Sequence, residues 1–177
     1  RNMELISFFN YKKKSNVIRA KNGDNDAFLT LINENRLNVY RVARGILKSE
    51  HDIEDAIQNT VVKAYEKINT LKKDEFFKTW LIRILINECN EIIRKNKRLE
   101  SINNGSNEER YNDTYENIDL INAINELNEE LRITTVLFYF EDMPIKDIAN
   151  TLKIPEGTVR SRLSRAREKL RYMMREV

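Results

Sequence analysis

The sequence predicts an all-α fold made of two small helical domains joined by a flexible acidic linker. Glycine and proline are rare, with four and two among 177 residues, and leucine, isoleucine, lysine and glutamate abound, as is typical of helices. Apolar residues recur at spacings of three and four on both sides of a polar stretch. That stretch, SINNGSNEERYNDTYEN, is acidic and nearly free of aliphatic residues, which favours a tether.

The polar stretch sets the predicted boundaries. We expect an N-terminal extension (1–16), a first helical domain (17–98), the linker (99–118) and a second helical domain (119–177). The extension has no clear periodicity, so no element is assigned to it.

The first domain is expected to begin with three helices. One passes through Val17 and Ile18 to a turn at 22–24, where Asp24 or Asn25 can cap the next helix. The second helix is expected to bury Ala27, Phe28, Leu31 and Ile32. A separate third helix carries Val39, Tyr40, Val42, Ala43, Ile46 and Leu47.

Ser49 precedes a strongly periodic helix with one apolar and one polar face. The apolar face holds Ile53, Ala56, Ile57, Thr60, Val61, Ala64, Tyr65 and Ile68. The polar face holds Asp52, Asp55, Gln58, Asn59, Val62 and Lys63. An exposed valine on a polar face fits a stripe that binds a partner protein.

A polar loop (69–75) leads to the longest helix of the first domain, from Phe76 to about Lys97. Five hydrogen-bond donors follow one another along it at spacings of four and three: Arg83, Asn87, Asn90, Arg94 and Lys97. Such a ridge can track phosphates while nearby aromatic rings stack on unpaired bases. An ordinary solvated face is the alternative, and the ridge alone favours neither.

The second domain is expected to begin with a helix over Ile118, Ile121, Ile124 and Leu127. Asn128 can cap a further helix bearing Leu131, Val136, Leu137 and Phe140. Two helices separated by a break at 153–154 follow, each opened by a proline, Pro144 and Pro155. A short helix, a turn and a longer helix, with small Ala149 at the crossing, predict a helix-turn-helix.

The second helix of this motif is basic. Val159, Leu163, Ala166 and Leu170 are expected to face inward, while the outer face presents Thr158, Arg160, Ser161, Ser164, Arg165 and Arg167. A basic helix that begins with compact residues suits the DNA major groove. The alternative is a helical hairpin with solvated arginines, but few acids balance these charges, so DNA binding is favoured.

An enzyme is disfavoured. The chain has one histidine, His51, and one cysteine, Cys89, with no glycine-rich phosphate loop and no Ser-His-Asp candidates. We therefore expect no catalytic residues, no cofactor, no metal and no small-molecule substrate. A single cysteine excludes an internal disulfide, consistent with a reducing cytoplasm.

Three segments in order resemble the extracytoplasmic-function sigma factors, promoter-recognition subunits of bacterial RNA polymerase. GTVRSRLSRAREKL (157–170) is close to the family's final helix. DIEDAIQNTVVKAYEKI (52–68) is similar to its polymerase-binding helix, and FKTWLIRILINECNEIIRKNKR (77–98) to its promoter-melting segment. The resemblance covers the chain from about Val17 to the end.

The resemblance implies a division of labour. The first domain (sigma region 2) would bind the polymerase clamp through Asp52, Asp55, Gln58, Asn59 and Val62. It would also melt the minus-ten element and hold its single strand through Lys72, Lys73, Phe76, Phe77, Arg83, Asn87, Asn90, Arg94 and Lys97. The second domain (sigma region 4) would bind the polymerase flap and read the minus-thirty-five duplex through the outer face listed above.

The resemblance also implies stress-response promoters, a cytoplasmic protein, and a membrane-anchored anti-sigma factor that could hold it at the inner membrane face. The alternative function is a helix-turn-helix transcriptional regulator that acts without polymerase. The face with Asp55, Gln58 and Val62 distinguishes the two, because a simple repressor would not need it.

Overall fold

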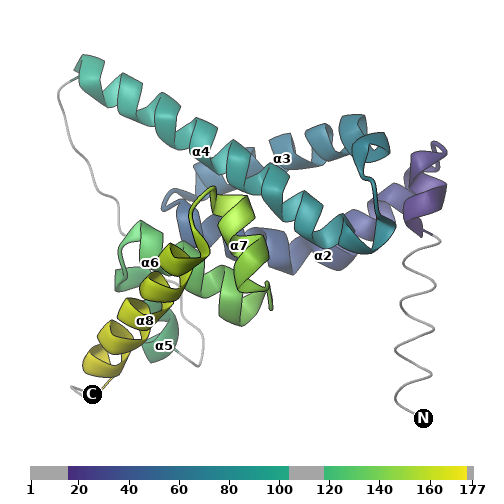
Figure 1. The fold of residues 1–177 in the computed structure, drawn as a ribbon. Coiled ribbons are helices and arrows are strands. Elements are labelled where there is room, and N and C mark those ends of the chain that lie inside the picture. The colour runs from purple at the N-terminus through teal and green to yellow at the C-terminus, as the bar shows by residue number, and fades with distance from the viewer. Residues whose placement is uncertain (1–15, 104–117, 175–177) are drawn as a thin grey trace, which may run out of the picture.

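The computed structural model describes residues 16–103 and 118–174, and every regular element within them is a helix (Figure 1). Residues 16–21 are helical. The longer helices are α2 (Asn25–Ile46), α3 (Glu50–Lys67), α4 (Phe77–Asn103), α5 (Ile118–Glu126), α6 (Glu129–Thr135), α7 (Ile145–Leu152) and α8 (Glu156–Met173). Short turns η1 (Ile68–Thr70) and η2 (Asp74–Phe76) precede α4, and a π-helical turn η3 (Val136–Phe140) follows α6. The predicted all-α class is confirmed.

Three helix starts are capped by side chains, and two of these caps, Asp24 and Asn128, are among the residues that the sequence analysis named. The carboxylate of Asp24 accepts from the backbone N–H of Ala27 at 3.0 Å, and Asn128 caps α6 by accepting from Leu131 at 3.1 Å. Ser49 caps α3 through a longer bond. The Ala27 N–H, and then Arg19, lower the pKa of Asp24. Each cap satisfies a backbone donor that has no partner within its helix.

The second and third expected helices form one continuous helix, α2, which corrects the prediction of a break between them. The polar residues 33–36 contain no glycine or proline that would end a helix. Asn35 is buried there, and its Nδ2 donates to the carbonyl of Leu31 at 2.7 Å. Because the amide of Asn35 is hydrogen-bonded within α2, burying this polar residue does not require a break in the helix.

The first half of the molecule is α2, α3 and α4 packed around fully buried side chains: Leu31, Val42, Ile53, Phe77, Leu81 and Leu85. Figure 1 shows α4 crossing the other helices and projecting beyond them at its C-terminal end. The helix continues to Asn103, so the predicted linker begins as helix. Residues 104–117 of that linker, and 1–15 of the predicted extension, lie outside the described residues.

The second half contains the predicted helix-turn-helix, formed by α7 and α8. Lys153 ends α7 in the left-handed conformation (φ 57°) and turns the chain toward Pro155, which precedes α8. Ala149 at the crossing is buried, as are the inward residues of α8: Val159, Leu163 and Ala166. A small cluster of Leu127, Leu131 and Ala166 joins α8 to the preceding helices.

The two halves pack against each other, an arrangement that the sequence does not predict. Most buried residues of both halves belong to one hydrophobic cluster, and α2 contacts α6 and η3 (Figure 1). At Gly45 the two halves approach closely, because a Cβ there would lie 3.2 Å from Cγ2 of Val136. Arg132 of α6 is buried beside it and donates from Nε to the Gly45 carbonyl at 2.6 Å.

Candidate nucleic-acid and polymerase interfaces

The outer face of α8 is open to solvent. Arg160, Ser161, Ser164, Arg165 and Arg167 are exposed, and Thr158 is partly buried. Arg160 pairs with Glu156 at 3.3 Å, whereas Arg165 and Arg167 have no ion-pair partner among the described residues. Free guanidinium groups on an exposed helix can contact guanine edges or phosphates without first breaking another contact.

A groove of about 340 Å³ lies between α6 and α8. Thr158, Ser161 and Arg165 line it, so the structure brings these predicted DNA-binding residues together. Arg162 lies at its edge, largely buried, and pairs with Glu130 at 3.1 Å. This pair ties α8 to α6, so Arg162 acts as a structural residue, whereas Arg165 and Arg167 have no ion-pair partner among the described residues.

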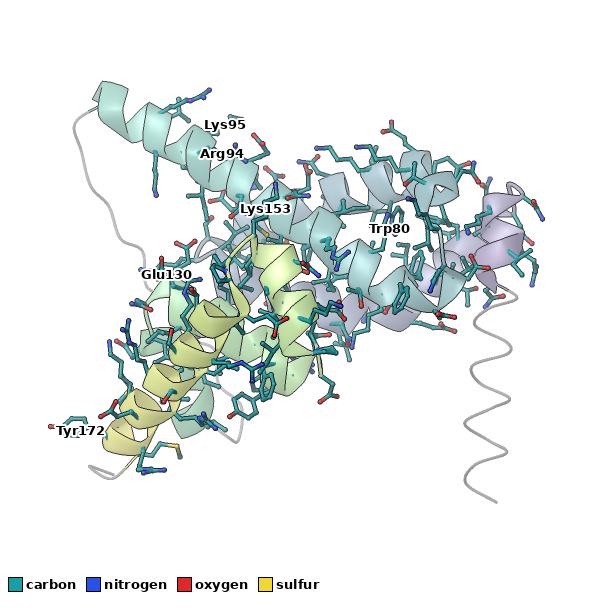
Figure 2. The ribbon with its side chains drawn as sticks, in the orientation of Figure 1. Trp80, Arg94, Lys95, Glu130, Lys153 and Tyr172 are labelled. Carbon is teal, nitrogen blue, oxygen red and sulfur yellow. The ribbon has the colours of Figure 1, made fainter. Side chains whose placement is uncertain are left out.

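The donors along α4 have two different environments. Asn87, Asn90, Arg94 and Lys97 are exposed, and Figure 2 shows Arg94 and Lys95 on the projecting part of the helix. Arg83 instead faces the second half of the molecule. Its Nε donates to Thr151 Oγ1 at 3.1 Å, and its Nη2 lies 3.9 Å from the carboxylate of Asp147.

The two adjacent phenylalanines before α4 differ in exposure. Phe77 is fully buried and packs against Trp80, with ring centroids 5.8 Å apart. In this structure it is therefore a core residue, which corrects the expectation that it is available to a base. Phe76 is 48% exposed, with Lys73 Nζ 5.8 Å from its ring centroid, and Lys72 is exposed nearby.

Lys21, which the sequence did not single out, holds the loop before α4. Its Nζ donates to the carbonyl of Leu71 at 2.7 Å and to Oδ1 of Asp74 at 2.5 Å. Leu71 and Asp74 flank Lys72 and Lys73 in the sequence. Lys21 therefore fixes the loop that carries these two exposed lysines. No periodic pattern in the sequence indicates this contact, because its partners lie 50 and 53 residues away.

The polar face of α3 is accessible. Gln58, Asn59 and Val62 are exposed, and Asp52 and Asp55 are partly buried. Asp52 accepts from Asn96 Nδ2 at 2.9 Å, and Asp55 lies 3.7 Å from His51. Val62 is 56% exposed on this face.

Glu141 is a further residue that sequence reasoning missed. It follows η3, and its carboxylate is completely buried between two cations of the first half. Lys78 Nζ lies 3.0 Å from one oxygen, and Arg41 Nη1 lies 3.5 Å from the other. A buried carboxylate is stable only when opposite charges compensate for its lost hydration, so this contact depends on both halves.

A basic helix-turn-helix in one half and a second basic helix in the other are features typical of a DNA-binding protein. Within residues 16–103 and 118–174, no group of His, Cys, Asp or Glu is arranged to hold a metal. None of the described helices is long and apolar enough to cross a membrane.

Comparison with known proteins identifies the class more narrowly. Residues 31–99 match Sigma-70 region 2, and residues 118–170 match Sigma-70, region 4. The chain is 28% identical to the sigma factor SigW of Bacillus subtilis, over 93% of this chain and 97% of that protein. It is 31% identical to the sigma-E factor of Haemophilus influenzae, over 86% and 89%.

Comparison with solved structures supports the same class of protein. The sigma factor RpoE of Bartonella quintana, in complex with the anti-sigma factor NepR, has a TM-score of 0.75 and 25% identity, over 84% of this chain and 96% of that one. CnrH, in complex with the cytosolic domain of CnrY, has a TM-score of 0.67 and shares the fold.

The chain therefore belongs to the extracytoplasmic-function sigma factors of bacterial RNA polymerase. Sigma factors as a class are not enzymes; they bind core RNA polymerase and promoter DNA. The function predicted from the sequence is confirmed at this level, and a regulator acting without polymerase is not favoured.

Proposed function

We propose that residues 17–98 bind the polymerase clamp and open the minus-ten element, while residues 119–177 bind the flap and read the minus-thirty-five duplex. The observation that carries this proposal is the free outer face of α8, where Arg165 and Arg167 project without ion-pair partners in the described chain. The matches to regions 2 and 4 support the division, because they fall on the two halves separately.

On α8, Arg160 and Arg165 are the proposed readers of base edges. A guanidinium can donate two parallel hydrogen bonds to guanine O6 and N7, which discriminates this base from the others. Thr158, Ser161, Ser164 and Arg167 are proposed to contact phosphates and so fix the register of the helix in the groove. The groove beside α6 supports this assignment, because Thr158, Ser161 and Arg165 line one side of it together.

In the first half, the loop before α4 and the ridge on α4 are proposed to hold the opened strand. Lys72 and Lys73 would attract the phosphates, and the exposed ring of Phe76 could stack on a base. Stacking on the ring offsets part of the free energy of unstacking that base from the duplex, which is about a few kcal/mol. Asn87, Asn90, Arg94 and Lys97 then extend a polar track along α4.

On α3, the proposed clamp-binding residues are Asp52, Asp55, Gln58, Asn59 and Val62. The exposure of Val62 on an otherwise polar face supports this role, because an isolated apolar side chain among polar ones suits the centre of a protein interface. We further propose that the chain acts without catalytic activity of its own, as part of the polymerase holoenzyme in the cytoplasm.

We also propose an anti-sigma factor as the controlling partner, anchored in the membrane and releasing this chain to stress-response promoters. One structurally similar sigma factor, RpoE of Bartonella quintana, was solved in complex with an anti-sigma factor, NepR. Such a partner could hold the chain at the inner membrane face.

Run-off transcription with purified core polymerase tests the proposed function. The wild-type chain should direct initiation at a defined start site on promoters selected from a random library. Val62→Asp should reduce binding to core polymerase and transcription together, because it places a charge in the proposed interface. Asn25→Asp, at an exposed position on α2, is the control for the added charge. If the wild-type chain confers no start-site selection, the proposed function is wrong.

A further inference from the structure

We infer that Glu88 and Asn96 are positioning residues for strand binding, because polar side chains of α3 hold both of them and so fix the rotation of α4. The inference rests on the proposed function, since it concerns the orientation of the ridge assigned there to the opened minus-ten strand. Neither residue belongs to the ridge or to the proposed polymerase-binding residues.

Glu88 is a buried carboxylate in the middle of α4. Its side chain is 6% exposed, and Lys63 Nζ on α3 donates to its Oε1 at 2.6 Å. A buried ion pair contributes little net stability, because lost hydration offsets most of the attraction, and apolar side chains of similar size often serve as well. What the pair supplies in addition is direction, since it forms only at one relative placement of the two helices.

Asn96 makes a second polar contact with α3, about two turns beyond Glu88. Its Nδ2 donates to Oδ2 of Asp52 at 2.9 Å. Among the described side chains of α4, Glu88 and Cys89 are the last that are buried, and Figure 1 shows the helix projecting from the core at its C-terminal end. The contact with Asp52 therefore holds a part of α4 that apolar packing holds only weakly.

Both contacts lie on the side of α4 opposite the ridge. At 3.6 residues per turn, Glu88 and Asn96 each point roughly 140° away from the mean direction of the ridge. Burial agrees with this geometry, because Glu88 is buried and Asn96 is partly buried, whereas Asn87 and Asn90 are exposed. Two contacts roughly 12 Å apart along one helix, at 1.5 Å per residue, define both its rotation and its position along α3.

A small rotation of α4 is enough to disturb the ridge. Side-chain tips lie about 6 Å from a helix axis, so a rotation of roughly 20° moves each of them by about 2 Å. Donor and acceptor atoms in a hydrogen bond are about 2.7–3.2 Å apart and tolerate no such displacement. The apolar contacts between α3 and α4 are not directional, so they constrain this rotation less than a polar contact does. The two polar contacts are therefore the part of the interface that orients the ridge.

Replacing the buried pair by apolar side chains separates positioning from stability. In Lys63→Met with Glu88→Leu no charge is left unpaired, so thermal stability should equal that of wild type or exceed it. Preformed holoenzyme with this variant should nevertheless bind a fluorescent minus-ten single strand roughly threefold to tenfold more weakly, as expected when one hydrogen bond to the strand is lost. A purely structural role of the pair predicts unchanged strand affinity in a variant that keeps its stability.

Two variants control this measurement. Lys67→Met with Glu66→Leu makes the same substitutions at exposed positions of α3 and should leave strand affinity within about twofold of wild type. Lys63→Arg keeps a cation opposite Glu88 and should also bind the strand within about twofold of wild type. Because Lys63 lies on the polar face of α3, the affinity of each variant for core polymerase is measured first, and only purified holoenzyme enters the strand assay.

A double-mutant cycle tests Asn96 independently of the buried pair. Asn96→Ala places a better helix former at a partly buried position, so the fold is retained. It should lower the strand affinity of the otherwise wild-type holoenzyme about threefold. In a background with Arg94→Ala and Lys97→Ala it should have no further effect, because the side chains that Asn96 positions are then absent. Equal losses in the two backgrounds would overturn the assignment of Asn96.

The outcomes separate this inference from the proposed function. If wild-type holoenzyme binds the minus-ten strand and holoenzyme with Lys63→Met and Glu88→Leu binds it equally well, the assignment of Glu88 is wrong and the proposed function stands. If that variant proves less stable than wild type, the Asn96 cycle decides, because its variants keep the buried pair. If wild-type holoenzyme binds no minus-ten strand, the proposed function itself fails.

Discussion

Arg132 donates from Nε to the carbonyl of Gly45 at 2.6 Å, across 87 residues of sequence. Its Nη1 also donates to the carbonyls of Asn125 and Leu127, and burial lowers the pKa of this guanidinium. One side chain thus joins the end of α2 to the junction of α5 and α6. The two halves of the chain are coupled by this contact as well as by their common core.

Replacing Arg132 should therefore destabilise the whole molecule. Arg132→Met would leave buried carbonyls without donors, and we expect a loss of about 2–4 kcal/mol in the free energy of unfolding. Urea denaturation followed by circular dichroism measures this loss. Arg19→Met, which removes only an exposed ion pair with Asp24, is the matched control and should change stability by less than about 1 kcal/mol. Equal effects of the two substitutions would contradict the structural role of Arg132.

Substitution by alanine should have different effects on stability at two helical glycines. Gly157→Ala meets nothing within 4 Å and should stabilise by about 0.4–1 kcal/mol, because the unfolded chain loses freedom. Gly45→Ala would press against Val136, which is buried and cannot move aside easily, so it should give no gain or a loss. Thermal unfolding of both variants checks this difference; a similar gain at Gly45 would argue against the close packing of the halves.

The residues of α8 that read bases and those that bind phosphates should be distinguishable by how their substitution changes the affinity for duplexes of different sequence and at different salt concentrations. Arg165→Ala should cost about 1–3 kcal/mol of binding to a minus-thirty-five duplex and little on a scrambled duplex. Arg167→Ala should weaken both duplexes alike and reduce the salt dependence of binding by about one charge. Fluorescence anisotropy at several salt concentrations measures both effects. Unchanged affinity of Arg165→Ala for the specific duplex would discard that assignment.

Lys21 should act on promoter opening through the loop that it holds. Lys21→Met removes the donor to Leu71 O and Asp74, so Lys72, Lys73 and Phe76 should lose their common orientation. We expect slower strand opening and a weaker base preference at the minus-ten element, with binding to the minus-thirty-five duplex unchanged. Arg19→Met, in the same N-terminal segment, should open the promoter normally. The assignment fails if Lys21→Met opens it at the wild-type rate with the same preference.

Cys89 should make stability fall at high pH. Burial raises the pKa of its thiol from 9.0 to about 12. Between these values the unfolded thiol loses its proton while the folded one keeps it, so rising pH favours the unfolded state. The free energy of unfolding should decrease across pH 9–12 by up to about 1.4 kcal/mol per pH unit from this group. Cys89→Ala should show a shallower pH dependence, and identical slopes would contradict the burial of the thiol.

Local features of this fold were predictable, whereas contacts between distant segments were not. The caps at Asp24, Ser49 and Asn128 and the turn before Pro155 follow from side-chain chemistry that acts over a few residues. Apolar periodicity likewise identified most helices. It could not show that residues 25–46 form one helix, because both halves of α2 fit the same pattern.

The functional residues that the sequence analysis missed were missed for a different reason. Arg132 and Glu141 appear in the sequence as ordinary charged residues, and only their burial against the first half gives them a role. Phe76 and Phe77 are chemically identical neighbours, so periodicity alone cannot decide which one enters the core. The resemblance to a family indicated which helices meet DNA and polymerase, but it carried no information about Lys21 or the contact between the halves.

Permanganate probing of a promoter bound by the reconstituted holoenzyme tests the central claim most directly, because it detects unpaired thymines at the element that the first half is proposed to open. With wild-type chain and core polymerase, thymines around position minus ten should become reactive, and Arg165→Ala should reduce this reactivity by weakening recruitment to the minus-thirty-five duplex. Thymines that stay unreactive on promoters bound by the wild-type holoenzyme would contradict the claim that this chain opens DNA.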